Sequence, residues 1–177
     1  MAVETNDAIV LVLMGVSGVG KTAAGTRLAA VLGWDFVDGA DFHPDAHMRK
    51  MRRGEPLTDG DRWPWLRAIR DFVHERLSDG PSSIVACSAL EAAYREVLLD
   101  GNPGAQIVYL KEAYDLLRQR TETRTDHFFD PDLLNSQFEA LEEPGSEAAL
   151  TVSVDAAPDA VVRTIRRELS ALAAASE

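Results

Sequence analysis

The stretch that decides the fold lies near the start of the chain and reads Gly15-Val16-Ser17-Gly18-Val19-Gly20-Lys21-Thr22. It follows an apolar run, Ile9 to Met14, and precedes a helix-like run, Ala23 to Leu32. Glycines at these spacings let successive backbone N–H groups point inward at phosphate oxygens, and the helix that follows adds the positive end of its dipole. The pattern predicts a nucleotide-binding phosphate loop (P-loop) between a buried strand and a helix.

Each position of this loop has an expected role. All eight residues from Gly15 to Thr22 are expected to contact the nucleotide, with the three glycines serving the backbone geometry. Lys21 should reach the β- and γ-phosphates, which makes it a candidate catalytic residue. The hydroxyl of Thr22 is placed to bind a magnesium ion that bridges the same phosphates.

Further apolar runs alternate with amphipathic helical patterns along the chain. Continuous apolar runs are typical of strands buried on both faces of a parallel sheet. The expected strands are Ile9 to Met14, Asp35 to Val37, Ser83 to Cys87, Gln106 to Leu110 and Leu150 to Val154. The expected helices are Ala23 to Leu32, Trp65 to Leu77, Ala113 to Arg120 and a last one with Pro158 near its first turn. This order predicts one α/β domain over residues 1–177, a three-layer, doubly wound parallel sheet of about five strands that binds ligands at the strands' carboxyl ends.

Composition excludes several classes of protein. The net charge of −11 argues against a nucleic-acid binder, which needs a basic surface. The single cysteine, Cys87, excludes an internal disulfide and favours a reducing, cytoplasmic setting. The first residues lack the basic region of a secretory signal, and the longest apolar run, Ala8 to Met14, is too short to span a bilayer. We expect neither nucleic acid nor membrane as a partner.

The residues after the P-loop favour a small-molecule kinase. The chain lacks the Asn-Lys-x-Asp-type segment that a GTPase uses to recognise its base. It also lacks the long apolar strand ending in Asp that is typical of a motor ATPase, because the apolar run from Ser83 ends in Cys87-Ser88-Ala89-Leu90. The carboxylate that helps to hold magnesium, through water, is then expected from Asp38 or Asp41. Either acid could also orient or deprotonate an acceptor hydroxyl, and Asp41 could instead cap the next helix.

Clustered cations in this acidic chain have two interpretations. They are Lys50, Arg52, Arg53 and Arg62 in one segment, and Arg118, Arg120 and Arg124 in another. The first group fits a carboxylate-bearing substrate, and the second fits a lid that neutralises a transferring phosphoryl group. Solvated surface explains either group as well. Asp61 could cap a helix that Pro64 opens.

Taken together, these segments resemble the bacterial gluconate kinases (gluconokinases), in the shikimate-kinase and nucleoside-monophosphate-kinase-like group of P-loop enzymes. The resemblance runs from Val12 to about Val154. Beyond the P-loop, it rests on His43-Pro44, Lys50-Met51, Gly54-Glu55-Pro56-Leu57-Thr58-Asp59, Asp61-Arg62-Trp63-Pro64-Trp65-Leu66, Cys87-Ser88-Ala89-Leu90, Tyr94-Arg95, His127-Phe128-Phe129, Ser136-Gln137-Phe138-Glu139 and Leu141-Glu142-Glu143-Pro144.

The resemblance implies transfer of the γ-phosphate of ATP to the terminal hydroxyl of D-gluconate, with Mg²⁺, giving 6-phosphogluconate and ADP. It also implies a homodimer, which the residues themselves do not fix. A substrate-binding helical segment is expected at about 42–65, and a lid at about 118–135 that carries the catalytic residues Arg120 and Arg124. The implied substrate-binding residues are Asp41, His43, Lys50, Arg53, Asp61, Arg62, Ser88, Arg95, His127 and Gln137.

Three positions depart from the family pattern, and they leave alternatives open. Ala40 stands where Asp is common, so the acid that meets the hydroxyl is Asp41 or Asp38. His47 stands where Asn is usual, and Asp126 replaces a small residue. A kinase for shikimate, adenylylsulfate or another sugar acid is one alternative, and a regulatory protein that holds ATP without an acceptor is another. The segment Asp155 to Pro158 is the expected wall for adenine.

Overall fold

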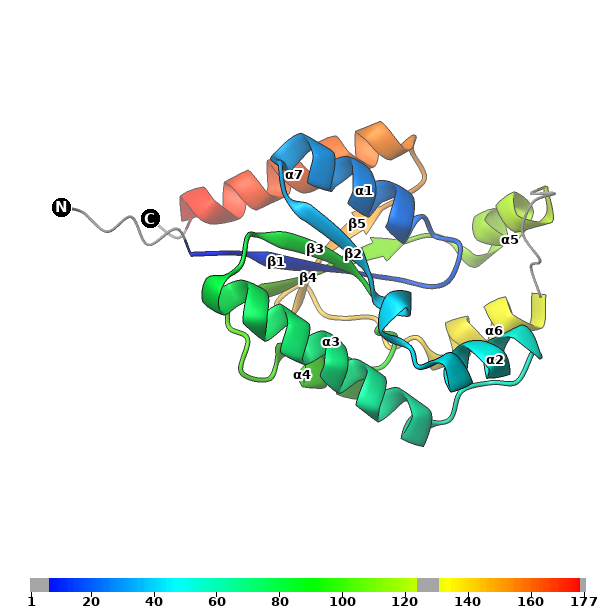
Figure 1. Ribbon diagram of the computed structural model, residues 1–177. Helices are drawn as coiled ribbons and strands as arrows, with labels where there is room; N and C mark the ends of the chain where they lie inside the picture. The colour runs from blue at the N-terminus through cyan, green and yellow to red at the C-terminus, as the bar shows by residue number, and fades with distance from the viewer. Residues whose placement is uncertain (1–6, 124–130, 176–177) are drawn as a thin grey trace.

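The computed structural model describes residues 7–123 and 131–175. Within these residues, five strands form one parallel sheet in the order β2-β3-β1-β4-β5 (Figure 1). The strands are β1 Val10–Met14, β2 Asp35–Asp38, β3 Ser83–Ala86, β4 Ala105–Lys111 and β5 Ala149–Ser153. All five predicted strands are confirmed, with ends shifted by at most one residue, and so is the α/β fold class.

Helices cover both faces of the sheet (Figure 1). They are α1 Lys21–Leu32, the 3-10 turn η1 Gly39–Phe42, α2 Asp45–Arg52, α3 Asp59–Asp79, α4 Ala92–Leu99, α5 Tyr114–Glu122, α6 Pro131–Ala140 and α7 Pro158–Ala175. Leu11 and Leu13 of β1 join the core beneath α1 and α7, whereas Val10, Val12 and Met14 join the core beneath α3 and α4. Every side chain of β1 is therefore buried, which explains its uninterrupted apolar run.

Several helices differ from the sequence predictions, α3 and α4 most clearly. The helix expected from Trp65 begins at Asp59, because the Thr58 hydroxyl accepts the Asp61 N–H (3.2 Å) and the Asp61 carboxylate accepts the Thr58 N–H (2.9 Å). Pro64 lies inside this helix and does not open it. Helix α4 was not predicted, because its short buried face includes the charged Arg95, which interrupts the apolar pattern.

The carboxyl ends of the strands meet at one edge of the sheet. Chain order reverses at β1, which pairs with β3 on one side and β4 on the other, so the loops that leave these strands diverge there. Helices α2, α5 and α6 gather beyond this edge, away from the layers formed by the longer helices (Figure 1). No helix in the described ranges combines the length and the apolar character needed to cross a membrane.

Gly39 lets the chain after β2 lie against the end of β3. A Cβ at this position would lie 2.5 Å from the carbonyl oxygen of Ala86. Because the backbone of a central strand cannot move away cheaply, Gly39→Ala should lower the free energy of unfolding by about 1–3 kcal/mol. Urea titration followed by circular dichroism measures this change.

The matched control is Gly145→Ala, since a Cβ there meets no atom within 4 Å. Its free energy of unfolding should stay close to that of the unmodified chain. Equal stabilities of the two variants would show that the contact with Ala86 does not constrain the loop.

Candidate active site

The P-loop turns from β1 into α1 through glycines in the left-handed region. Gly18 has a φ of 82° and Gly20 a φ of 101°, values that a side chain with a Cβ rarely adopts. Gly20 is also the N-cap of α1, and no side chain caps that helix. The N–H groups of the first turn of α1 are therefore available to an anion, as phosphate binding at a helix N-terminus requires.

Lys21 lies across the loop that precedes it. Its ammonium group donates to the carbonyl oxygens of Gly15 (2.8 Å) and Val16 (3.0 Å). Burial lowers the pKa of Lys21 to about 8, against the opposing attraction of nearby groups that include Asp38. Near neutral pH the side chain still carries most of its positive charge, in surroundings where a phosphate charge is weakly screened.

The two predicted metal-binding residues lie together. The Thr22 hydroxyl donates to one carboxylate oxygen of Asp38 (3.2 Å), and the Ala40 N–H donates to the other (3.0 Å). Among the described residues, no group of three or more His, Cys, Asp and Glu side chains could hold a metal ion. A hydroxyl beside one carboxylate fits Mg²⁺, which takes few protein ligands and completes its shell with phosphate oxygens and water.

The acid loop, Asp38 to Asp41, is fixed from two sides. Gly39 packs against the end of β3, and the indole N–H of Trp65 on α3 donates to the Gly39 carbonyl (2.7 Å). Asp41 lies in η1 with its side chain exposed, and within the described ranges no hydrogen bond or ion pair engages its carboxylate. The two acids thus differ, because Asp38 is held by Thr22 and the backbone while Asp41 is available to another molecule.

A polar cluster joins the loop after η1 to α2 and α3. The ring of His43 stacks on Trp65, with centroids 4.2 Å apart and planes at 12°, and its Nδ1 lies 3.4 Å from Nδ1 of His47. His47 Nε2 lies 3.6 Å from one oxygen of Asp61, and Lys50 Nζ lies 2.7 Å from the other. The bonds from Lys50 and from the Thr58 N–H hold the pKa of Asp61 far below its usual range, so this carboxylate stays charged.

Three other predicted residues lie around the P-loop and the loop after β3. The Gln137 side-chain oxygen, from α6, accepts the Ser17 N–H (2.5 Å), and the Ser88 carbonyl accepts the Gly15 N–H (3.2 Å). Arg95 is buried and donates to the carbonyl oxygens of Ala89, Leu90 and Glu142 (2.8–3.0 Å). Since Ala89 has a φ of 45°, Arg95 holds a strained loop next to Ser88.

The remaining predicted cations have different surroundings. Arg53 pairs with Glu55 (2.9 Å) with more than half of its side chain exposed, so nothing in the described chain directs it toward the P-loop. Arg62 donates to the Tyr94 hydroxyl (3.2 Å) and lies 3.5 Å from a carboxylate oxygen of Asp59, near the start of α3. Predicted site residues Arg124 and His127 lie outside the described residues.

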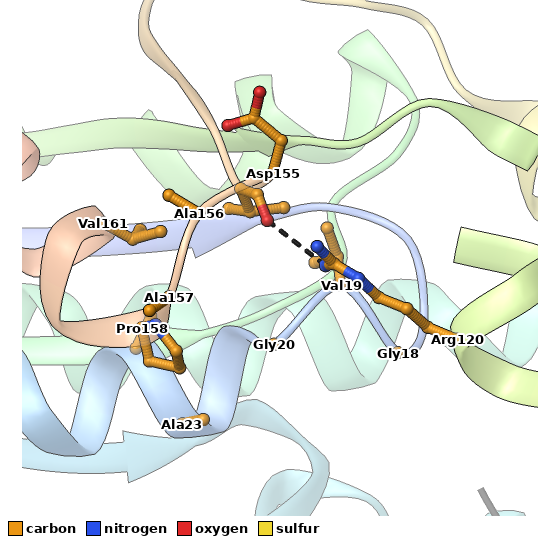
Figure 2. A pocket seen from close by; sticks show the side chains of 12 residues that line it. Gly18, Val19, Gly20, Ala23, Arg120, Asp155, Ala156, Ala157, Pro158 and Val161 are labelled. Carbon is orange, nitrogen blue, oxygen red and sulfur yellow. Dashed lines mark hydrogen bonds between the residues drawn. The ribbon is translucent and has the colours of Figure 1, made fainter. Parts of the chain in front are cut away.

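A pocket of about 370 Å³ opens between the P-loop and the chain that follows β5 (Figure 2). Its lining residues are Gly18, Val19, Gly20, Ala23, Ala24, Arg120, Val154, Asp155, Ala156, Ala157, Pro158 and Val161. Arg120 reaches it from α5 and donates to the Val154 carbonyl (3.2 Å). Asp155 to Pro158, the segment expected to contact adenine, thus lines this pocket together with Arg120.

Sequence reasoning missed two residues that shape the site. Trp65 both stacks on His43 and holds Gly39, although it had been assigned only to a helix. Glu112 is buried and lies 2.8 Å from Arg120. The available signal for Glu112 was its place directly after an apolar strand, at the sheet edge where ligands bind.

Comparisons with known proteins agree with this geometry. A protein-family profile described as an AAA domain matches residues 10–144. The thermoresistant gluconokinase of Escherichia coli (strain K12) is 40% identical over 164 residues, which is 92% of this chain and 94% of that protein. The gluconokinase of Gluconobacter oxydans (strain 621H) is 41% identical over 162 residues, which is 91% of each protein.

Solved structures give the same picture. A gluconokinase from Sinorhizobium meliloti 1021 superposes with a TM-score of 0.83 at 39% identity, covering 94% of each chain. Shikimate kinase from Aquifex aeolicus vf5 superposes with a TM-score of 0.60 at 16% identity, covering 93% of this chain and 98% of that one. The second likeness indicates a shared fold alone.

The surroundings of His43 predict how stability depends on pH. Burial, followed by the neighbouring His47 and Arg62, lowers the pKa of His43 from 6.5 to about 4. Between these values the unfolded chain binds a proton that the folded chain does not, so stability falls as the pH drops through that window. His43→Gln should remove part of this fall, as measured by urea unfolding at pH 7, 6 and 5.

Asp61 does not obscure this effect, because its depressed pKa makes its stabilising contribution disappear only at lower pH. His74→Gln is the control: His74 lies at an exposed position of α3, with its Nδ1 3.2 Å from Oδ1 of Asn102, and the pH dependence of this variant's stability should follow that of the unmodified protein. Parallel pH curves for His43→Gln and the unmodified protein would show that His43 is not the group that resists protonation.

Proposed function

This chain belongs to the gluconokinase family, and on that premise we propose how its site divides the transfer of a phosphoryl group from ATP to D-gluconate. Its reaction is the ATP-dependent phosphorylation of the terminal hydroxyl of D-gluconate, which yields 6-phosphogluconate and ADP. The observation that carries the division of roles is the contact between Thr22 of the P-loop and Asp38 of the acid loop. It brings a phosphate-binding element and two carboxylates to the same edge of the sheet.

We propose that ATP lies along the P-loop with its nucleobase in the adjoining pocket. The backbone N–H groups from Gly15 to Thr22 then face the phosphates, and Lys21 reaches the β- and γ-phosphates. Asp155 to Pro158 form the wall beside the base, which the cavity between this segment and the P-loop supports. Small side chains at Ala156 and Ala157 leave room for a flat ring.

Mg²⁺ would be held by the Thr22 hydroxyl and, through water, by the Asp38 carboxylate. When bound, it neutralises the charge of the β- and γ-phosphates and so stabilises the transfer. The hydrogen bond from the Ala40 N–H keeps the Asp38 carboxylate directed at Thr22. This arrangement leaves Asp41 for the acceptor.

We propose that the acceptor binds over η1, α2 and the start of α3. Asp41 accepts the proton of the sugar-acid hydroxyl, whose oxygen forms a bond to the γ-phosphorus while the bond from that phosphorus to the β,γ-bridging oxygen breaks. His43, with its low pKa, stays neutral at pH 7 and can exchange hydrogen bonds with hydroxyl groups. Lys50, Arg62 and Ser88 supply polar contacts to the polyol and its carboxylate.

The other predicted roles are proposals of the same kind. The substrate-binding helical segment at about 42–65 corresponds to η1, α2 and the beginning of α3. The lid at about 118–135 begins in α5, continues into α6, and would bring Arg124 and Arg120 toward the nucleotide. Gln137, bonded to Ser17, joins α6 to the P-loop. Arg53, Arg95, Asp61 and His127 complete the proposed substrate-binding set.

We further propose that the protein is cytoplasmic, forms a homodimer and folds as one domain over residues 1–177. A reducing compartment suits the buried free thiol of Cys87. The two clusters of buried apolar residues share the strands of a single sheet, which supports one folding unit. Size-exclusion chromatography with light scattering measures the oligomeric state.

Purified protein with ATP, Mg²⁺ and D-gluconate should produce 6-phosphogluconate. Added 6-phosphogluconate dehydrogenase then reduces NADP, and the absorbance of NADPH reports the rate. The signal should require every component. Binding of ATP without any signal would instead point to another acceptor, such as shikimate, adenylylsulfate or a different sugar acid, which a screen with labelled ATP would identify.

The two acids of the acid loop should respond differently to substitution. Asp41→Asn should lower kcat by about 100-fold or more with little change in KM for ATP, because it removes the acceptor of the hydroxyl proton. Asp38→Asn should instead raise the Mg²⁺ concentration needed for half-maximal rate, because the metal loses a water-mediated ligand. Steady-state kinetics at varied ATP, gluconate and Mg²⁺ separate the two effects. Full turnover in both variants would exclude this division of roles.

A further inference from the structure

Glu112 is a buried carboxylate at the carboxyl end of β4. Its side chain is only 2% exposed, although it lies at the edge of the sheet where the site opens. One oxygen accepts the Ala113 N–H (3.2 Å), and the other lies 2.8 Å from Nη1 of Arg120. This second oxygen has no hydrogen-bond partner among the described residues, so the ion pair with Arg120 is its only neutralising contact there.

The partner of this carboxylate lines the nucleotide pocket. Arg120 extends from α5 past the P-loop glycines toward the chain after β5 (Figure 2). The same Nη1 that lies next to Glu112 also donates to the Val154 carbonyl (3.2 Å). Glu112 after β4 and Val154 after β5 therefore hold one guanidinium nitrogen from two neighbouring strand ends.

The ion pair with Glu112 restricts the conformations of the Arg120 side chain. A buried carboxylate is costly unless it is paired, so Glu112 strongly favours the one rotamer of Arg120 that reaches it. A guanidinium held in one place is a planar cation that can lie on the face of an aromatic ring without losing further conformational entropy. Arg120 itself is 44% exposed, so without Glu112 its long side chain would sample many positions in solvent.

We propose that Glu112 is a positioning residue for nucleotide binding. It holds Arg120 against the pocket so that the Arg120 guanidinium contacts the nucleobase. The proposal rests on the assignment of that pocket to the base of ATP. Held in this way, Arg120 serves the base and does not neutralise the transferring phosphoryl group, so for this residue the inference replaces the catalytic role expected from the sequence. Gluconate, which binds over α2, is not involved. Glu112 therefore contributes to the affinity for the base and not to the chemical step.

The variant Glu112→Gln keeps the shape of the side chain and removes its charge. Its KM and Kd for ATP should rise about tenfold, because the loss of the buried ion pair frees Arg120 from the position in which it contacts the base. Its kcat and its KM for gluconate should stay within about twofold of the values of the unmodified protein. The contact with the base is equally strong in the ground state and in the transition state, so its loss weakens ATP binding without slowing the chemical step. Glu112→Asp, which keeps the charge but shortens the side chain, should weaken ATP in the same direction and gives a second variant should Glu112→Gln fail to fold.

Tripolyphosphate distinguishes positioning from general structural support. It carries the three phosphates without a base, so its Kd, measured by calorimetry with Mg²⁺, should be the same for Glu112→Gln and the unmodified protein. A purely structural role, in which Glu112 only holds α5 to the sheet, would weaken tripolyphosphate and ATP together. That outcome, or an unchanged Kd for ATP, would overturn the proposal.

The same helix supplies a matched control. Glu122 pairs with Arg118 (2.9 Å) on the exposed face of α5, where both side chains are about half exposed. Glu122→Gln removes a carboxylate of the same kind from the same helix, away from the pocket, and should leave all these constants unchanged. A loss of ATP affinity in Glu122→Gln equal to that in Glu112→Gln would mean that the pocket contact is irrelevant.

Ala157→Trp separates failure of this inference from failure of the pocket assignment. A large ring at this position fills the pocket, so ATP should bind much more weakly while tripolyphosphate binds as before. If Ala157→Trp leaves ATP binding unchanged, the base binds elsewhere, and both the pocket assignment and the role of Glu112 are wrong. If Ala157→Trp weakens ATP and Glu112→Gln does not, the pocket assignment stands and only the role of Glu112 is wrong.

Discussion

The parallel pairing of β1 between β3 and β4 is the constraint on which the rest of the structure depends. In a parallel sheet all strands end at the same edge, so the segments that follow the five strands meet there. They are the P-loop after β1, the acid loop after β2, the strained loop after β3, Glu112 after β4 and the pocket wall after β5. Complete burial of β1 fixes its register, because a shift by one residue would exchange the side chains of the two cores. The geometry of the site thus depends on the packing of the sheet.

Both substrates are anions, and the protein carries a net charge of −11, so attraction has to be local. The cations near the site are accordingly held by partners: Lys50 by Asp61, Arg62 by Tyr94 and Asp59, and Arg120 by Glu112. Such pairs add little to stability when exposed, and their value lies in orientation. A long flexible cation becomes a fixed one, which loses less entropy when it contacts a ligand.

The acid loop illustrates how neighbouring acids acquire different surroundings. Asp38 and Asp41 are three residues apart and look alike in sequence. Burial of Gly39 against β3, together with the bond from Trp65, orients the loop so that Asp38 contacts Thr22 while Asp41 is exposed. The two tethers come from a strand and a helix that lie far apart in sequence. This explains why the proposed division between a metal-binding acid and a base depends on packing and not on the local pattern.

The sequence by itself determined the fold class, all five strands, the P-loop and the membership of the gluconokinase family, because these depend on local spacing and on uninterrupted apolar runs that only a buried parallel sheet accommodates. It also named Thr22 as a metal ligand, with Asp38 or Asp41 as the accompanying acid. Tertiary structure decided what depends on contacts between distant segments: the start of α3 at Asp59, the engagement of Arg95 with backbone carbonyls, and the pairing of Glu112 with Arg120. The sequence does not distinguish a solvated charged residue from a buried one. Only the packing around the residue decides whether it is buried and with which charged group it pairs.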